Sequence, residues 1–128
     1  MKTFFRWLLG VSFIAAGVNH FVNPAVYERI MPPYLPWRFE LVLLSGAAEA
    51  ILGVLVLFPR FAFIARWGLI ALLVAIFPAN VHMALHTELY PDLPPAALWG
   101  RLPLQFMLIW WVWAVTRPSA AREASQKR

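Results

Sequence analysis

The chain has 128 residues, of which 62% are hydrophobic and 13% are charged, and it contains no cysteine. This composition is too apolar for a soluble domain and predicts an integral membrane protein, and the absence of cysteine excludes disulfides, thiolate metal sites and dithiol chemistry. The net charge of +5 does not indicate nucleic acid as a partner, because the basic residues are scattered around hydrophobic segments and form no continuous stripe.

Four apolar segments follow one another along the chain, at residues 4–22, 39–58, 61–85 and 98–115. A bilayer core of about 30 Å requires roughly 20 apolar helical residues for each crossing, so the chain has room for four crossings and for no soluble catalytic domain. We therefore predict an all-α membrane protein in which residues 1–117 form one antiparallel bundle of four transmembrane helices. The basic and apolar start, MKTFFRWLLG, is similar to a signal peptide, but the apolar run continues to Val22, which favours an uncleaved first span.

The connections between these segments differ in character. The first, NPAVYERIMPPYLPW, is rich in proline, which cannot continue a helix, and it predicts an interfacial cap. The second, FPRF, is short and predicts an antiparallel hairpin, whereas the third, TELYPDLPPAA, is polar and broken by proline. Residues 118–128 predict a basic polar tail that is attracted to anionic lipid headgroups.

The basic residues are distributed unequally between the two sides of the predicted bundle. By the positive-inside rule, this asymmetry places both termini and the FPRF turn in the cytoplasm and both proline-rich loops outside. Tryptophans near the ends of the segments are typical of an interfacial aromatic belt. The cytoplasmic side would carry Lys2, Arg6, Arg60, Arg66, Arg117, Arg122, Lys127 and Arg128, and the outer side Arg29, Arg38 and Arg101.

An acidic residue, Glu49, lies in the middle of the second apolar segment, close to the expected bilayer midplane. An ionised carboxylate facing lipid there is costly, so we expect it to face the bundle interior, carry a proton or have a partner. Small and polar residues recur at helical spacing around it and in two other segments, which predicts inward-facing stripes. These stripes are Ser45, Gly46, Glu49 and Gly53; Gly10, Phe13, Gly17 and His20; and Gly68, Ala71, Ala75, Pro78, His82 and His86.

The stripes together predict a polar pocket that opens to the outer side. Its floor would be Glu49 and its roof the MPPYLPW loop, with His20 and His82 roughly 10 Å above the carboxylate and their side chains inclined toward it. We expect a direct or water-bridged link between the three groups, and no comparable polar group in the inner half of the bundle. The candidate catalytic residues are Glu49, His82 and His20, and the candidate ligand-binding residues are Asn19, Asn80, Gln105, Tyr34 and Ser45.

Each candidate also has a structural interpretation. Glu49 can act as a hydrogen-bond partner of Ser45, the amides as interhelical links, Tyr34 as an interfacial anchor and His86 as a solvated loop residue. A metal site formed by His20, His82, His86 and Glu49 is a further alternative, although its only local spacing is the four-residue step from His82 to His86.

The sequence resembles the DoxX family of small four-helix membrane proteins of bacteria and archaea. The similar stretches are AGVNHFVNPAVYERIMPPYLP, SGAAEAILGVLVLFPR, WGLIALLVAIFPANVHMAL and PLQFMLIWWVW. The resemblance implies a multi-pass protein of the bacterial inner membrane that is associated with redox reactions, and members are often labelled oxidoreductases. The chain lacks the cysteines of the thiol-linked relatives and has no GxGxxG nucleotide signature. The residues that match the family pattern are Asn19, His20, Pro32, Pro33, Glu49, Pro78, Asn80 and His82.

Two functions are consistent with these observations. In the first, the protein binds a lipophilic small molecule of the quinone or phenol type, with which Glu49 and a histidine exchange protons, as a component of a membrane oxidoreductase. In the second, it is a non-catalytic subunit or assembly factor whose polar stripe binds another membrane protein or a second copy of the chain. Transport is a third alternative.

Overall fold

The computed structural model describes residues 2–118 and 120–128, and every regular element among them is helical. This confirms the predicted all-α class. The elements are the α-helices α1 (Lys2–Val22), α2 (Pro24–Ile30), α3 (Arg38–Val56), α4 (Ala62–Leu85), α5 (Pro95–Thr116) and α6 (Ala120–Gln126), with the 3₁₀ turns η1 (Pro59–Phe61) and η2 (Thr87–Leu89).

Three helical segments are long and apolar enough to cross a membrane: Lys2–Val22, Arg38–Val56 and Pro59–Leu85. The fourth long helix, α5, has 22 residues, which suffices for a crossing by length. Its mean hydropathy is lower because it contains Arg101, Gln105 and four tryptophans. All four long helices lie within a few residues of the predicted apolar segments.

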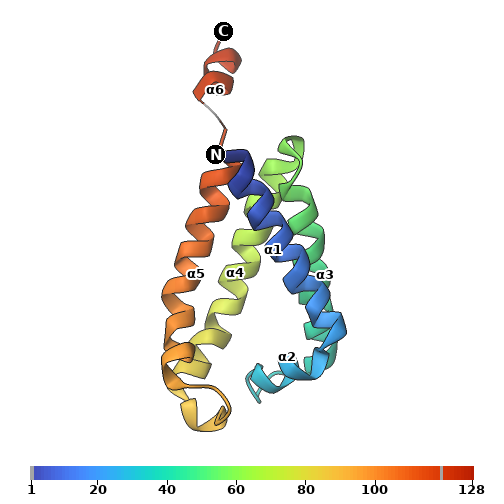
Figure 1. The fold of residues 1–128 in the computed structure, drawn as a ribbon, viewed down its shortest axis with the longest axis vertical. Helices are drawn as coiled ribbons and strands as arrows, with labels where there is room; N and C mark the ends of the chain where they lie inside the picture. The colour runs from blue at the N-terminus through green and yellow to red at the C-terminus, as the bar shows by residue number, and fades with distance from the viewer. Residues whose placement is uncertain (1, 119) are drawn as a thin grey trace.

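The long helices form two pairs (Figure 1). Helix α1 packs most extensively against α3, and α4 packs against α5, while α3 also contacts α4. The ribbons of the two pairs come together at the end that holds the N-terminus and diverge toward the end that holds α2 (Figure 1). We call these the terminal end and the α2 end.

The main hydrophobic core lies toward the terminal end and draws on all four long helices. It is built by Leu9 and Phe13 of α1, Val56 of α3, and partners from α4 and α5. Because lipid tails are as apolar as leucine, the close fit of these side chains stabilises the core more than removal from water does. A smaller core, formed by Met83, Tyr90 and Leu98, lies at the α2 end. The remaining residues of the main core are Ala65, Leu69, Leu73, Val112 and Val115.

Paired glycines bring α1 and α3 into close contact. A Cβ atom on Gly10 would lie 2.9 Å from the carbonyl oxygen of Gly53, and one on Gly17 would lie 2.6 Å from the backbone nitrogen of Ala50. These positions therefore have no room for a side chain. The small stripes predicted on these two helices are inward-facing, as expected, since Gly10, Gly17 and Gly53 are all buried.

The prediction of an inward-facing small stripe on α4 is wrong for most of its length. Ala71, Ala75 and Pro78 are exposed on the surface of the bundle, whereas the buried face of this helix carries Leu69 and Leu73. The leucines fill the space between α3 and α5, which small side chains would leave empty. Sequence spacing alone could not decide between the two faces.

Two segments predicted without regular structure contain short helices. In the proline-rich connection, Pro24 occupies the first turn of α2, where its missing N–H group costs nothing. Trp37, the residue just before α3, lies in the left-handed backbone region, with φ 52°. In the predicted polar tail, residues 120–126 form α6.

We expect Gly17→Ala to destabilise the protein, because the added methyl group meets backbone atoms of α3 that cannot move aside. Overpacking of this kind costs about 1–3 kcal/mol. The matched control is Gly100→Ala in α5, where no atom lies within 4 Å of the added group. Thermal unfolding in detergent, followed by circular dichroism, should show a lower Tm for Gly17→Ala and an equal or higher Tm for Gly100→Ala. Equal effects of the two changes would contradict the close α1–α3 contact.

Candidate functional site

A buried pair of ionisable side chains joins α1 to α3. The Nε2 atom of His20 lies 3.6 Å from Oε2 of Glu49, and the two side chains are 9% and 11% exposed. Of the direct or water-bridged links predicted between Glu49 and the two histidines, the one to His20 is thus present as a direct contact. Since an isolated charge is costly in such surroundings, the pair can only be stable when the two groups compensate each other.

The other ring nitrogen of His20, Nδ1, fixes the orientation of the imidazole. Its Nδ1 atom lies 2.9 Å from the carbonyl oxygen of Val42, which can only accept, so Nδ1 carries a hydrogen and donates it. The Ser45 hydroxyl lies 3.3 Å from the same nitrogen and donates to the same carbonyl. Nε2 is left to face Glu49. A proton taken up by the pair can therefore lie on Nε2 or on the carboxyl group.

The backbone geometry of α3 makes this contact possible. The Cβ atom of His20 lies 2.5 Å from the position that a Cβ atom on Gly46 would occupy. The glycine therefore lets the histidine side chain lie across α3 and reach Val42 and Glu49. The spacing of Val42, Ser45, Gly46 and Glu49 places all four on one face of α3, as i, i+3 and i+4 neighbours.

Tyr27 of α2 covers the histidine on its other side. Its ring centroid is 3.9 Å from that of His20, with the ring planes inclined by 34°. Asn19 donates a hydrogen bond to the Tyr27 hydroxyl at 2.7 Å, and Asn23 donates to the Asn19 side chain at 2.8 Å. Asn19 thus orients the cover of the pair. Tyr27 was not predicted as a site residue. Pro24, four residues after His20, could have indicated a helical turn there that brings Tyr27 back toward the histidine.

His82 does not join this pair. Its recorded contacts are with Tyr34, at a ring centroid distance of 5.3 Å, and with His86, whose ring stacks on it at 4.4 Å. The Nδ1 atom of His82 is buried without a hydrogen-bond partner among the described residues. The reason is the orientation of α4: its leucine face is turned to the core, and α4 follows α5 away from α1 and α3 at this end (Figure 1).

The amides predicted as ligand-binding residues in α4 and α5 bind each other. Asn80 donates to the side-chain oxygen of Gln105 at 2.7 Å, and Gln105 donates to the backbone oxygen of Leu73. Gln105 is buried. These hydrogen bonds connect α4 to α5, as the structural interpretation of the amides predicted. Asn80 and Gln105 therefore take no part in the His20–Glu49 site.

The four residues considered for a metal fall into two separate pairs, His20 with Glu49 and His82 with His86. Within residues 2–118 and 120–128, no group of three His, Asp or Glu side chains is arranged to hold a metal ion. The geometry therefore gives no support to the metal alternative.

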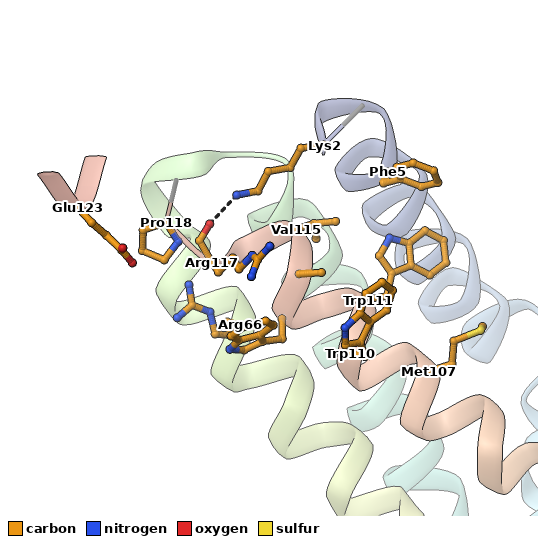
Figure 2. A pocket seen from close by; sticks show the side chains of 12 residues that line it. Lys2, Phe5, Arg66, Met107, Trp110, Trp111, Val115, Arg117, Pro118 and Glu123 are labelled. Atoms are coloured by element: carbon orange, nitrogen blue, oxygen red, sulfur yellow. Dashed lines mark hydrogen bonds between the residues drawn. The ribbon is translucent and has the colours of Figure 1, made fainter. Parts of the chain in front are cut away.

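Two clefts in the described part of the chain lie at the terminal end, opposite to the α2 end where the pocket was predicted. The larger has a volume of about 1050 Å³ and is lined by basic and aromatic side chains, including Lys2, Arg66 and Trp110 (Figure 2). The expectation that this half of the bundle carries no comparable polar group is therefore wrong. Arg66 was interpreted only as a topology signal, but its side chain folds back along the bundle and binds Thr116.

These features define an all-helical protein with three helices suited to cross a membrane and a buried acid–imidazole pair between two of them. Residues 9–116 match the family described as "Domain of unknown function (DUF8561)", and because the match covers most of the chain, the chain belongs to this family. No curated protein and no solved structure gives a significant match.

The loop residue Tyr90 should make the protein less stable at alkaline pH. Its hydroxyl is buried without a partner among the described residues, and burial, followed by the nearby Tyr34, raises the pKa of Tyr90 above the ordinary 10.0. A raised folded-state pKa gives stability that is complete below the unfolded pKa and is lost as pH rises through the folded pKa. We expect Tyr90→Phe to raise the free energy of unfolding by about 1 kcal/mol at neutral pH and to reduce the alkaline loss. Denaturant unfolding measured against pH checks this, and an unchanged alkaline loss in Tyr90→Phe would count against it.

Proposed function

We propose that this protein binds a lipophilic small molecule of the quinone or phenol type beside the His20–Glu49 pair and exchanges a proton with it. The observation that carries the proposal is the buried approach of His20 to Glu49: Nε2 lies 3.6 Å from the carboxyl oxygen, while Nδ1 donates to the Val42 carbonyl. A general acid or base needs a group that can release or take up a proton at a defined place, and this pair provides one.

The surroundings of the pair support a ligand rather than a purely structural role. Three groups from outside the pair hold the imidazole in one orientation. The Val42 carbonyl and the Ser45 hydroxyl lie within hydrogen-bond distance of Nδ1, and the Tyr27 ring, supported by Asn19, packs against the imidazole. Fixing a reactive side chain through its neighbours is the arrangement that proton transfer requires. The chain would supply the proton exchange, and a redox partner would supply or remove electrons.

The membrane setting is part of the same proposal. Helices α1, α3, α4 and α5 would each cross a bacterial inner membrane, with both termini in the cytoplasm. Supporting this orientation, Lys2, Arg6, Arg66 and Arg117 gather around the terminal end of the bundle. The His20–Glu49 pair would then lie between the bilayer midplane and the outer surface, and both residues match the pattern of the DoxX family that the sequence resembles.

The proton-exchange role predicts that Glu49→Gln binds a quinone without pH dependence. The change keeps the shape of the side chain and removes its titration. With decylubiquinone as the probe and the intact chain in detergent, we expect affinity to vary with pH in the unaltered protein. In Glu49→Gln it should be constant with pH and weaker by roughly tenfold, the value of one hydrogen bond to a charged group.

The matched control for this experiment is Glu40→Gln, which removes an exposed carboxylate from the first turn of the same helix. It should keep both the affinity and the pH dependence. Retention of an unaltered pH profile in Glu49→Gln would refute the proton-exchange role.

A second function is favoured by the outward-facing stripe on α4. Ala71, Ala75 and Pro78 are small residues exposed on the surface of a helix suited to cross the membrane. Exposed small residues at helical spacing let another transmembrane helix approach closely. On this alternative the protein is a subunit or assembly factor that binds another membrane protein, or a second copy of itself, through α4.

This alternative predicts that enlarging the stripe abolishes association. Ala75→Leu should remove a stoichiometric partner, or the homo-oligomer, from the complex purified in mild detergent, because the added side chain separates the helices. Val18→Leu enlarges an exposed position on α1, away from the stripe, and should leave the complex intact. Size-exclusion chromatography with light scattering measures the difference; a monomer in all three forms of the protein would argue against this function.

A further inference from the structure

The cleft at the terminal end combines positive charge with an apolar wall. Figure 2 shows Lys2, Arg66 and Arg117 toward one side and Phe5, Trp111 and Met107 toward the other. Lys2 and Phe5 come from α1, Arg66 from α4, and the remaining residues from α5 or directly after it. Helices far apart in the sequence thus build one surface of mixed character.

Three basic side chains donate hydrogen bonds to the last two carbonyl groups of α5 and to the carbonyl group of the residue that follows. Arg6 donates to the Val115 oxygen at 2.8 Å, Arg66 to the Thr116 oxygen at 2.5 Å and Lys2 to the Arg117 oxygen at 2.6 Å. The C-terminus of a helix carries only about half a negative charge. Three full positive charges therefore more than compensate it, and this end of the bundle keeps a strong positive potential.

Hydrogen-bonding capacity remains on two of the cations that line the cleft. Arg66 uses Nε and one hydrogen of Nη2 on Thr116, so within the described residues its Nη1 group has no recorded partner. Arg117 lies with its guanidinium over the Trp113 ring, 5.0 Å from the centroid, and its side chain makes no hydrogen bond within the described residues. A guanidinium presents its donors in the fork geometry that matches a phosphate.

The apolar wall of the cleft is open to the surroundings of the bundle. Trp110 is 66% exposed and Met107 is 50% exposed, and both belong to the membrane-length helix α5. In a bilayer such side chains contact acyl chains, and tryptophans at a span end lie at headgroup depth. A ligand that fills the cleft thus meets phosphate-type donors at one end and hydrocarbon at the other.

We propose that this cleft is a binding site for an anionic phospholipid, with the phosphodiester on Arg66 and Arg117 and an acyl chain along Trp110 and Met107. The volume of about 1050 Å³ suits a headgroup with the upper part of its chains. This site is separate from the His20–Glu49 pair and does not depend on its function. Glu123 of α6 also lines the cleft. Its negative charge repels the phosphodiester and lowers the affinity for the lipid.

The test is a titration of the intact chain in neutral detergent micelles with phosphatidylglycerol or phosphatidylcholine, followed by native mass spectrometry. We expect phosphatidylglycerol to bind in preference to phosphatidylcholine. Arg117→Gln should weaken this binding by roughly fivefold, the effect of one basic residue near an anionic lipid. The matched control is Arg29→Gln, an exposed arginine in α2 at the opposite end of the bundle, which should bind as the unaltered chain does.

Two further variants keep the test informative if a loss of binding reflects misfolding. Arg66→Lys keeps the positive charge but loses the planar set of guanidinium donors. Phosphatidylglycerol should therefore bind more weakly, while the Tm of the protein stays the same. Glu123→Gln should bind it more tightly, a gain that no folding defect produces. Equal binding of the two lipids, equal losses in Arg117→Gln and Arg29→Gln, or displacement of the lipid by glycerol phosphate would overturn the proposal.

Discussion

The close approach of α1 and α3 is the constraint on which the rest of the structure depends. Two pairs of glycines, Gly10 with Gly53 and Gly17 with Gly46, replace side chains with direct backbone contact at two levels of the same interface. Because no side chain stands at Gly46, the ring of His20 can lie across α3 and reach a carbonyl group 22 residues further along the chain. The buried acid–imidazole pair is a consequence of backbone packing, and its geometry is as rigid as the helix crossing that creates it.

The two ends of the bundle satisfy polar groups in opposite ways. In the α1–α3 interface an acid and a base compensate each other away from water, so neither needs to reach the surface. At the terminal end, by contrast, Arg6 and Arg66 cross between helices to bind the final carbonyl groups of α5, and their positive charge remains in excess. The first arrangement suits the handling of a neutral ligand with a mobile proton, and the second suits the binding of a fixed anion. The proposed ligands therefore follow from the charge balance of each end.

The sequence predicted the helical class, the positions of the four long helices and the contact between His20 and Glu49, because hydropathy and spacing act over short stretches of chain. It did not predict which face of α4 is buried, since Leu69 and Leu73 compete with Ala71 and Ala75 for the interior and only the space between neighbouring helices decides. That rotation also removed His82 from the predicted site. Contacts that a side chain makes with a distant helix could not be predicted either. Arg66 was interpreted as a topology signal, because no residue near it in the sequence indicates its hydrogen bond to Thr116, 50 residues later.

The hydrogen bonds from α1 to the end of α5 connect residues 109 and 115 positions apart. A ribosome releases the chain in order, so α1 is made long before the carbonyl groups that Lys2 and Arg6 bind. Until α5 is made, other groups such as water have to satisfy these two side chains. The contact between α1 and the end of α5 therefore forms late in folding, and it cannot stabilise the earlier helices while synthesis continues.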